Sequence, residues 1–286
     1  MDNSRRNFLR GAFQSAARAA ISAQEAMKEE RPAAAPVSQP LLSEAEVERY
    51  SRQLVLPEWG EREQILLRDA SVLVVGAGAL GTPVAQYLAG AGVGRIGLVD
   101  SDVVEVSNLH RQPLHFTPDL GVPKVESAAA KLRFLNPDVL IEPYQVRLDE
   151  TNAAGLVEGQ DLVIDCSDSF ETRYAVNRAC CDAGIDLIEG GAVGWSGLVM
   201  TILPRATACY RCAFPVEPED ARSCAEAGIL GPVAGTLGSL QALEAIKLLS
   251  GAQPPLLDYF LSVDLATLEF TRVHVQRRTD CADCGG

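Results

Sequence analysis

The chain has 286 residues, of which 47% are apolar, and its 25 basic and 38 acidic side chains give a net charge of −13. This length and apolar content suffice to bury a core without disulfides, which excludes a wholly disordered polymer. The charge reaches −15 once the six basic and four acidic groups of residues 1–40 are set aside, which disfavours nucleic-acid binding. No transmembrane segment is expected, because no stretch comes near about 18 uninterrupted apolar residues.

The first forty residues contain Ser4-Arg5-Arg6-Asn7-Phe8-Leu9-Arg10, which resembles a bacterial twin-arginine export signal. Such a signal needs an apolar stretch after the arginines, whereas residues 11–23 are rich in alanine and include Gln14 and Arg18. The linker over residues 31–36 is too rich in proline and alanine to join a core. We therefore expect a flexible tail over residues 1–40, with an export signal or a docking segment for a partner as the alternatives.

Residues 41–286 are expected to form one α/β domain. A capping-box pattern at Ser43-Glu44-Ala45-Glu46 predicts the first helix, and short continuous apolar runs predict buried strands. We expect helices over 43–52, 61–67, 79–91, 122–135, 171–182 and 233–249. Strands are expected over 71–75, 95–100, 139–146, 161–165, 185–189 and 198–203, and a hairpin over 259–263 and 268–275. This alternation predicts a Rossmann-like, doubly wound, mostly parallel sheet with a C-terminal antiparallel extension.

The turn Gly76-Ala77-Gly78-Ala79-Leu80-Gly81 lies between a predicted strand and a predicted helix, and Asp100 ends the next strand. The glycines allow a phosphate to approach backbone N–H groups at the helix N-terminus, and an acid at the end of the second strand can accept from ribose hydroxyls. The pattern predicts a nucleotide site without distinguishing a dinucleotide from ATP. An NAD(P)-dependent oxidoreductase is therefore one hypothesis.

Two cationic residues follow Asp100, Arg111 in the segment 107–112 and Lys124 in the segment 121–127. Both segments are expected at the same carboxyl-end crevice of the sheet. There Arg111 and Lys124 would offset the repulsion between an anionic nucleophile and a triphosphate, a need that NAD binding does not create. Spacing alone leaves open the alternative that both cations pair with surface acids.

Several motifs, in order from about Ser43 to the C-terminus, resemble those of the MoeB/ThiF family (HesA/MoeB/ThiF) of E1-like activating enzymes. They are Arg49-Tyr50-Ser51-Arg52-Gln53, the glycine turn, Asp100 with Ser107-Asn108-Leu109-His110-Arg111-Gln112, Pro123-Lys124-Val125-Glu126-Ser127, Asp165-Cys166-Ser167-Asp168 and Cys209-Tyr210-Arg211-Cys212. The resemblance implies ATP-dependent adenylation of the C-terminal Gly-Gly carboxylate of a small ubiquitin-like sulfur-carrier protein (MoaD/ThiS-like), in sulfur transfer for cofactor biosynthesis. A sulfur donor protein is a further expected partner.

The resemblance also assigns roles to single residues. It implies that Asp100 binds the ribose and that Asp168 is a Mg²⁺ ligand. It also implies that the phosphates are bound by Asn108, Arg111 and Lys124. The other expected nucleotide contacts are Gly76, Gly78, Ala79, Gly81, Ser107 and Ser169. Ala79 stands where the family usually has glycine, and Ser169 where it has asparagine.

Two of these roles carry a further implication. Arg52 matches an arginine that reaches into the partner subunit's nucleotide site, which implies a homodimer. For Asp168 the alternative is a helix N-cap, which its residue type suits equally well.

Four cysteines form two Cys-x-x-Cys pairs, Cys209 with Cys212 and Cys281 with Cys284. Two such pairs can complete a closed Cys₄ zinc site, which would be structural and would join the C-terminal hairpin to the middle of the chain. Redox pairs are the alternative. Free thiols together with ATP chemistry favour a cytoplasmic location.

Cys224 resembles a cysteine that, in some family members, bonds to the activated carrier or relays sulfur. It would attack the acyl-adenylate as a thiolate or persulfide. Of the three histidines, only His110 is expected near the site. The hypothesis is thus a dimeric adenylyltransferase; the alternatives are an NAD(P)-binding oxidoreductase and a non-catalytic ATP-binding scaffold.

Overall fold

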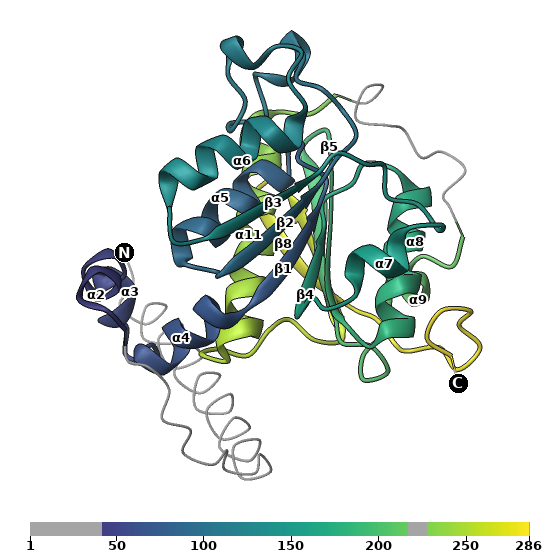
Figure 1. The fold of residues 1–286 in the computed structure, drawn as a ribbon. Helices are drawn as coiled ribbons and strands as arrows, with labels where there is room; N and C mark the ends of the chain where they lie inside the picture. The colour runs from purple at the N-terminus through teal and green to yellow at the C-terminus, as the bar shows by residue number, and fades with distance from the viewer. Residues whose placement is uncertain (1–41, 217–227, 286) are drawn as a thin grey trace, which may run out of the picture. The chain divides into compact units, whose positions relative to one another are not determined.

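The structure is a computed structural model and describes residues 42–216 and 228–285. Within these ranges one sheet of eight strands has the order β3-β2-β1-β4-β5-β6-β7-β8 (Figure 1). The parallel strands are β1 (Ser71–Val75), β2 (Arg95–Val99), β3 (Leu140–Tyr144), β4 (Leu162–Asp165) and β5 (Asp186–Val193). The antiparallel extension consists of β6 (Ser196–Ile202), β7 (Tyr259–Asp264) and β8 (Glu269–His274). The predicted fold class is confirmed.

Helices cover both faces of the sheet (Figure 1). One face carries α5 (Gly81–Ala91), α6 (Lys124–Leu135) and α11 (Gly231–Ser250), and the other carries α7 (Ala153–Val157), α8 (Phe170–Ala183) and α9 (Tyr210–Ala213). Two separate apolar clusters, one on each side of the sheet, form the core. Every residue of β1 and β4 is buried, as expected for parallel strands covered on both faces.

The remaining helical segments lie before β1 or in the crossover from β2 to α6. They are α2 (Glu44–Arg49), α3 (Ser51–Leu54), α4 (Glu61–Asp69), η1 (Val106–Asn108) and η2 (Thr117–Asp119). The predicted capping box is present, because the Glu46 N–H donates to Ser43 Oγ and the Ser43 N–H donates to Glu46 Oε2 at 2.7 Å.

Several boundaries differ from the prediction. The helix expected over 43–52 divides at Tyr50, whose backbone leaves the helical region and whose buried ring lies against Gly92. The helix expected from residue 79 begins at Gly81, because the preceding residues form the turn. Helices α7 and α9 were not predicted, since five and four residues are too short to show a helical period.

The carboxyl ends of β1, β2 and β4 meet at one edge, which brings together the turn after Val75, Asp100 and the loop after Asp165. Gly76 lies at this junction with φ +95°, where a Cβ would stand 2.8 Å from the Cys166 carbonyl oxygen. Only glycine fits such a position without strain. Within the described ranges, no helix has both the length and the apolar character that crossing a bilayer requires.

Candidate functional site

A cavity of about 830 Å³ opens at this carboxyl edge of the sheet. Its lining comes from the ends of β1, β2 and β4, from the crossover between β2 and α6, and from parts of β5, β6, α8 and α9. The residues that line it and that the sequence analysis singled out are Gly76, Gly78, Ala79, Asp100, Asn108, Arg111, Lys124, Asp168 and Ser169. The fold therefore brings residues from four separate motifs to one concave surface, as expected at the switch point of a doubly wound sheet.

Asp100 is fixed by backbone groups on both sides. Its Oδ2 accepts the Ala77 N–H at 2.8 Å, and its Oδ1 accepts the Asp102 N–H at 2.8 Å. Burial raises the pKa of this carboxyl above its usual value, and the nearby Lys124 ammonium acts in the opposite direction. The side chain is thus held rigidly between the glycine turn and the cationic crossover.

The two cations differ in their surroundings. Lys124 begins α6, is buried, and donates to Asp102 Oδ2 at 2.7 Å. Arg111 donates to the Ser107 carbonyl oxygen at 2.5 Å and to His110 Nε2 at 2.9 Å, and pairs with no acid among the described residues. The predicted alternative of pairing with surface acids therefore holds for Lys124 and not for Arg111, although both line the cavity.

The helix N-cap that the sequence offered as an alternative for Asp168 is formed by its neighbour Ser169. The N-cap of α8 is Ser169, whose Oγ accepts the Thr172 N–H at 3.2 Å. The alternative interpretation of Asp168 as that cap is wrong, because Asp168 makes no hydrogen bond to the first N–H groups of α8. Asp168 is exposed at the cavity, and in the described part of the chain its carboxylate has no hydrogen-bond or ion-pair partner.

Some predicted site residues do not line the cavity. Arg52 is exposed on α3, and Ser107 faces outward with its Oγ donating to Glu105 Oε2. Gly81 packs under the turn, where a Cβ would overlap the Gly76 carbonyl oxygen. Cys224 lies outside the described residues, as does the predicted tail.

Sequence reasoning missed a buried arginine at the cavity. Arg173 forms an ion pair with Glu189, which is fully buried on β5, and donates to the Ser167 carbonyl oxygen at 2.6 Å. Asp165 lies opposite Glu189 in the strand register. Burial, followed by the adjacent Asp165 carboxylate, raises the pKa of Glu189. No sequence pattern indicates this cluster, because it depends on pairing between β4 and β5.

The expectation that only His110 lies near the site is also wrong. His115 is buried behind the glycine turn, with its Nε2 2.9 Å from the Ala77 carbonyl oxygen. The crossover folds back over the turn after η1, which residue spacing alone does not show.

The four cysteines of the two Cys-x-x-Cys pairs converge, with all their sulfurs within 4.8 Å of one another. Cys209 Sγ lies 3.8 Å from Cys212 Sγ and 3.6 Å from Cys281 Sγ, and Cys212 Sγ lies 3.4 Å from Cys284 Sγ. A zinc ion bound at about 2.3 Å from each sulfur sets the sulfurs of a tetrahedron about 3.8 Å apart. The cluster therefore has the dimensions of a four-cysteine metal site.

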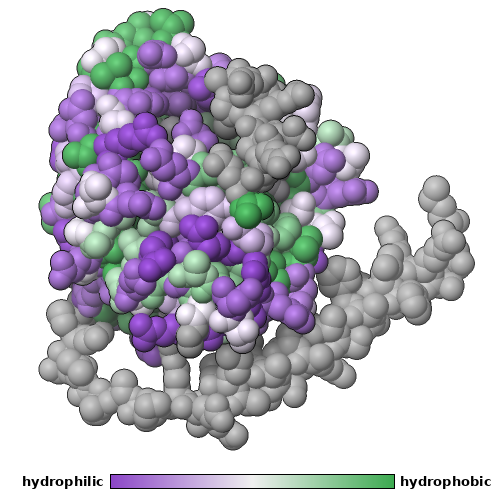
Figure 2. Space-filling view, turned by 90° about the vertical axis from the view of Figure 1, so that its right-hand side faces the viewer, coloured by the Kyte–Doolittle hydropathy of each residue, from purple (hydrophilic) through white to green (hydrophobic). Residues whose placement is uncertain are grey.

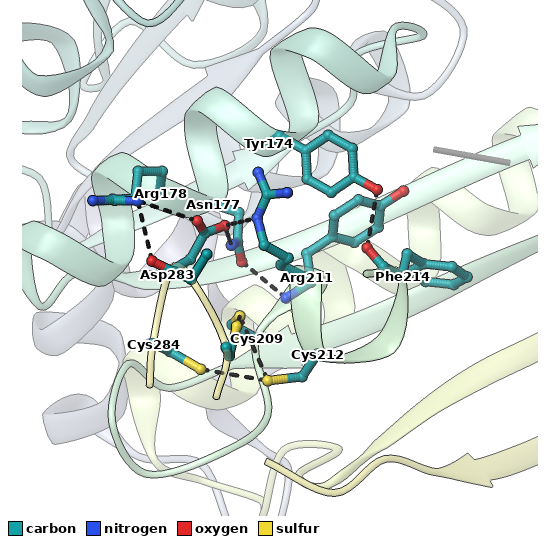
Figure 3. Close-up of polar contacts among 12 residues, drawn as sticks. Tyr174, Asn177, Arg178, Cys209, Arg211, Cys212, Phe214, Asp283 and Cys284 are labelled. Atoms are coloured by element: carbon teal, nitrogen blue, oxygen red, sulfur yellow. Dashed lines mark hydrogen bonds and ion pairs between the residues drawn. The ribbon is translucent and has the colours of Figure 1, made fainter. Parts of the chain in front are cut away.

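Hydrogen bonds tie this cluster to α8 (Figure 3). Asp283, between the last two cysteines, accepts from Asn177 Nδ2 at 2.7 Å and from Arg211 Nε at 2.8 Å. Asn177 Oδ1 accepts the Tyr210 N–H at 2.8 Å, and the Arg211 guanidinium stacks 4.2 Å from the Tyr174 ring centre. Both cysteine pairs are thus anchored to the helix whose N-terminus lies at the cavity.

The sequence matches the model of the ThiF family over residues 50–283. The chain is 50% identical over 247 residues to the adenylyltransferase and sulfurtransferase MOCS3 of Sus scrofa, an alignment that covers 85% of this chain and 54% of that protein. It is 44% identical to the SAMP-activating enzyme E1 of Haloferax volcanii, covering 85% of this chain and 91% of the relative. The sulfur carrier protein adenylyltransferase of Thermus thermophilus is 46% identical, with 84% and 91% covered.

The chain thus spans about half the length of the MOCS3 relatives and most of the length of the two prokaryotic ones. Among solved structures, the crystal structure of E. coli MccB with ATP aligns with a TM-score of 0.75 and 26% identity, covering 83% of this chain and 75% of that one. The motifs, the fold and these similarities lead to one conclusion: the chain belongs to the ThiF family.

Proposed function

We propose that this protein adenylates the C-terminal Gly-Gly carboxylate of a small ubiquitin-like sulfur-carrier protein. The observation that carries the proposal is the convergence of Asp100, Arg111, Lys124 and Asp168 on one cavity beside a glycine turn. The names of the relatives support it, since two of them are called a SAMP-activating enzyme E1 and a sulfur carrier protein adenylyltransferase.

In the proposed reaction a carboxylate oxygen of the carrier attacks the α-phosphorus of ATP. The bond from the α-phosphorus to the bridging oxygen breaks, and pyrophosphate leaves with the electron pair. No general base is needed, because a terminal carboxyl is already ionised at neutral pH. The barrier comes from bringing two anions together, and fixed cations lower it. Arg111 and Lys124 supply this charge, with Asn108 beside them and Asp100 holding the ribose.

A magnesium ion would add further positive charge on the phosphate oxygens. Asp168 is the residue suited to hold it, because its carboxylate lines the cavity and has no partner within the described ranges. Oxygen ligands of this kind, completed by waters and phosphates, are what Mg²⁺ prefers. Lys124 would then exchange Asp102 for a phosphate when the nucleotide binds.

The four-cysteine cluster is proposed to hold structural zinc. Four sulfur ligands leave no open position for catalysis, and none of the four cysteines lines the cavity. All four thiols are buried and none is in a disulfide. Zinc bound here would join residues from the middle and the end of the chain.

We further propose a homodimer in which Arg52 serves the partner's cavity. Arg52 is exposed and does not line the cavity of its own chain, so a second subunit gives it a function. An apolar region caps an otherwise largely polar surface in Figure 2, at the level where Figure 1 places the crossover from β2 to α6. That crossover exposes apolar side chains, namely Val103, Val106, Phe116, Leu120 and Val122. Surfaces of this kind favour association.

Cys224 and a sulfur donor belong to the same proposal as later steps. After adenylation, a thiolate or persulfide at Cys224 would displace AMP from the acyl-adenylate. The cytoplasmic location expected from thiol use stays a prediction.

Carrier-dependent exchange of labelled pyrophosphate into ATP tests the proposal. A small protein that co-purifies with this chain and ends in Gly-Gly is used as the substrate. The same small protein without its two terminal glycines is the control. Exchange that requires the intact tail supports adenylation. Tight binding of NADH with no ATP binding would favour an oxidoreductase, and ATP binding without any exchange would favour a scaffold.

A further inference from the structure

Four side chains form a hydrogen-bonded chain behind the glycine turn, outside the cavity itself. Lys131 donates to Ser127 Oγ at 2.8 Å, Ser127 Oγ lies 2.9 Å from His115 Nδ1, and His115 Nε2 lies 2.9 Å from the Ala77 carbonyl oxygen. Asp119 forms an ion pair with Lys131. Both His115 and Ser127 are 3% exposed.

The groups at the two ends of this hydrogen-bonded series, the Lys131 amine and the Ala77 carbonyl, determine which atoms between them carry hydrogens. A carbonyl oxygen only accepts, so His115 Nε2 carries a hydrogen. The Lys131 ammonium only donates, so Ser127 Oγ accepts from Lys131 and has its own hydrogen available for His115 Nδ1 and for the Asp119 carboxylate, the two acceptors beside it. The bond to the Ala77 carbonyl therefore requires a hydrogen on His115 Nε2. Burial lowers the pKa of His115, which favours the neutral ring with its hydrogen at that nitrogen.

The bond from His115 determines how one peptide group of the turn is oriented. The Ala77–Gly78 bond is trans, so the Gly78 N–H points in the direction opposite to the Ala77 carbonyl. Because His115 holds that carbonyl toward the interior, the Gly78 N–H is turned to the side of the cavity that Gly78 lines. This N–H makes no hydrogen bond to any of the described residues. The N–H of Ala77 is fixed as well, because it donates to Asp100 Oδ2.

We propose that His115 is a positioning residue that orients the Gly78 N–H toward the phosphates of the nucleotide. If this peptide group flipped, a carbonyl oxygen would face the phosphates and repel them. The inference rests on ATP binding, as proposed above, and concerns the phosphates rather than the nucleoside. A loss of this bond should therefore weaken the binding of ATP and leave adenosine binding unchanged.

The test uses the full chain with MgATP and with adenosine, measured by calorimetric titration. His115→Gln places an amide N–H at the reach of Nε2 and can still donate to Ala77, whereas the shorter His115→Asn cannot. We expect His115→Asn to weaken ATP binding about tenfold, His115→Gln to stay within about threefold of the wild type, and adenosine binding to change less than about twofold.

Equal ATP affinity in the two variants, or equal losses of ATP and adenosine binding, would overturn the role of His115. If His115→Asn does not fold, Ser127→Ala replaces it, since loss of the donor to Nδ1 lets the ring turn a lone pair toward Ala77. A loss of about threefold for ATP alone then supports the proposal, and unchanged ATP binding contradicts it. A wild-type protein that binds no ATP overturns the proposed function as well, which separates the two failures.

Discussion

Asp283 accepts a hydrogen bond from Asn177, with 2.7 Å between Oδ2 and Nδ2 (Figure 3). This contact joins residues 106 positions apart and fastens the last cysteine pair to α8. The Asp283 carboxylate is only 2% exposed and also forms an ion pair with Arg211. It therefore neutralises the Arg211 guanidinium next to the cysteines and holds the two cysteine segments together. Around metal sites, such outer contacts fix the geometry of the ligands.

Asp283→Ala is expected to destabilise the protein by about 2 to 3 kcal/mol, because Asn177 and Arg211 lose a charged acceptor in a buried place. Urea unfolding measures the change. Asp280→Ala is the matched control, since Asp280 lies three residues away, is exposed and, among residues 42–216 and 228–285, forms an ion pair with Arg278 alone. Equal effects of the two variants would show that Asp283 has no special part in the anchoring.

Removal of the metal is expected to lower the thermal midpoint while ATP binding persists at low temperature. The physical reason is that metal binding adds to folding stability, whereas none of the four cysteines lines the cavity. Elemental analysis should find one zinc per chain, and Cys212→Ser should reduce that content. A chelator that strips the zinc without shifting the midpoint would contradict a structural role.

Arg111→Ala and Asp168→Ala are each expected to lower pyrophosphate exchange by about 100-fold or more, because each removes charge that acts on the phosphates. Both residues are at the cavity surface, so the thermal midpoint should stay near that of the wild type. Arg62→Ala provides the control for lost positive charge, since Arg62 is exposed on α4. Full exchange in either site variant would remove its assigned role.

Arg173→Met is expected to cost about 3 to 5 kcal/mol, since it leaves Glu189 buried without its cation next to Asp165. The double variant Arg173→Met with Glu189→Met should recover much of this loss, because the uncompensated charge is gone. Chemical unfolding of the two variants gives the comparison. If the double variant is as unstable as the single one, packing of Arg173 rather than its charge carries the stability.

The pKa of His115 predicts a pH dependence of stability. Burial lowers the folded-state pKa below the unfolded value of about 6.5, so the unfolded chain binds the proton first. The contribution of His115 to the free energy of unfolding is complete above about pH 6.5. It is lost as the pH falls from there through the lowered folded-state pKa of His115. The hydrogen bond to the Ala77 carbonyl and the Asp100 carboxylate raise the pKa of His115 and so oppose burial, whereas Lys131 and Lys124 lower it.

Unfolding of the wild type and of His115→Gln at pH 7.5 and pH 5.5 measures this dependence. The variant should lose less stability than the wild type, because glutamine does not titrate. The other two histidines, His110 and His274, are exposed and serve as an internal reference. Parallel pH profiles in both proteins would contradict this account.

Much of the fold could be predicted because its signals are local. The apolar run before Gly76, the capping box at Ser43 and the acid at the end of β2 each lie within a few residues of the structure they specify. The prediction erred where a neighbour in space decides. Tyr50 interrupts the first helix, and its buried ring packs at Gly92, which lies 42 residues further along the chain.

The sequence by itself determined the strand and helix pattern, the glycine turn and the two cysteine pairs as separate motifs. Only the tertiary structure decided that the cysteine sulfurs meet, that Arg173 pairs with Glu189, and that His115 stands behind Ala77. Local motifs depend on backbone geometry within a turn or a strand. The other contacts depend on strand order and register, which place residues together regardless of their separation along the chain.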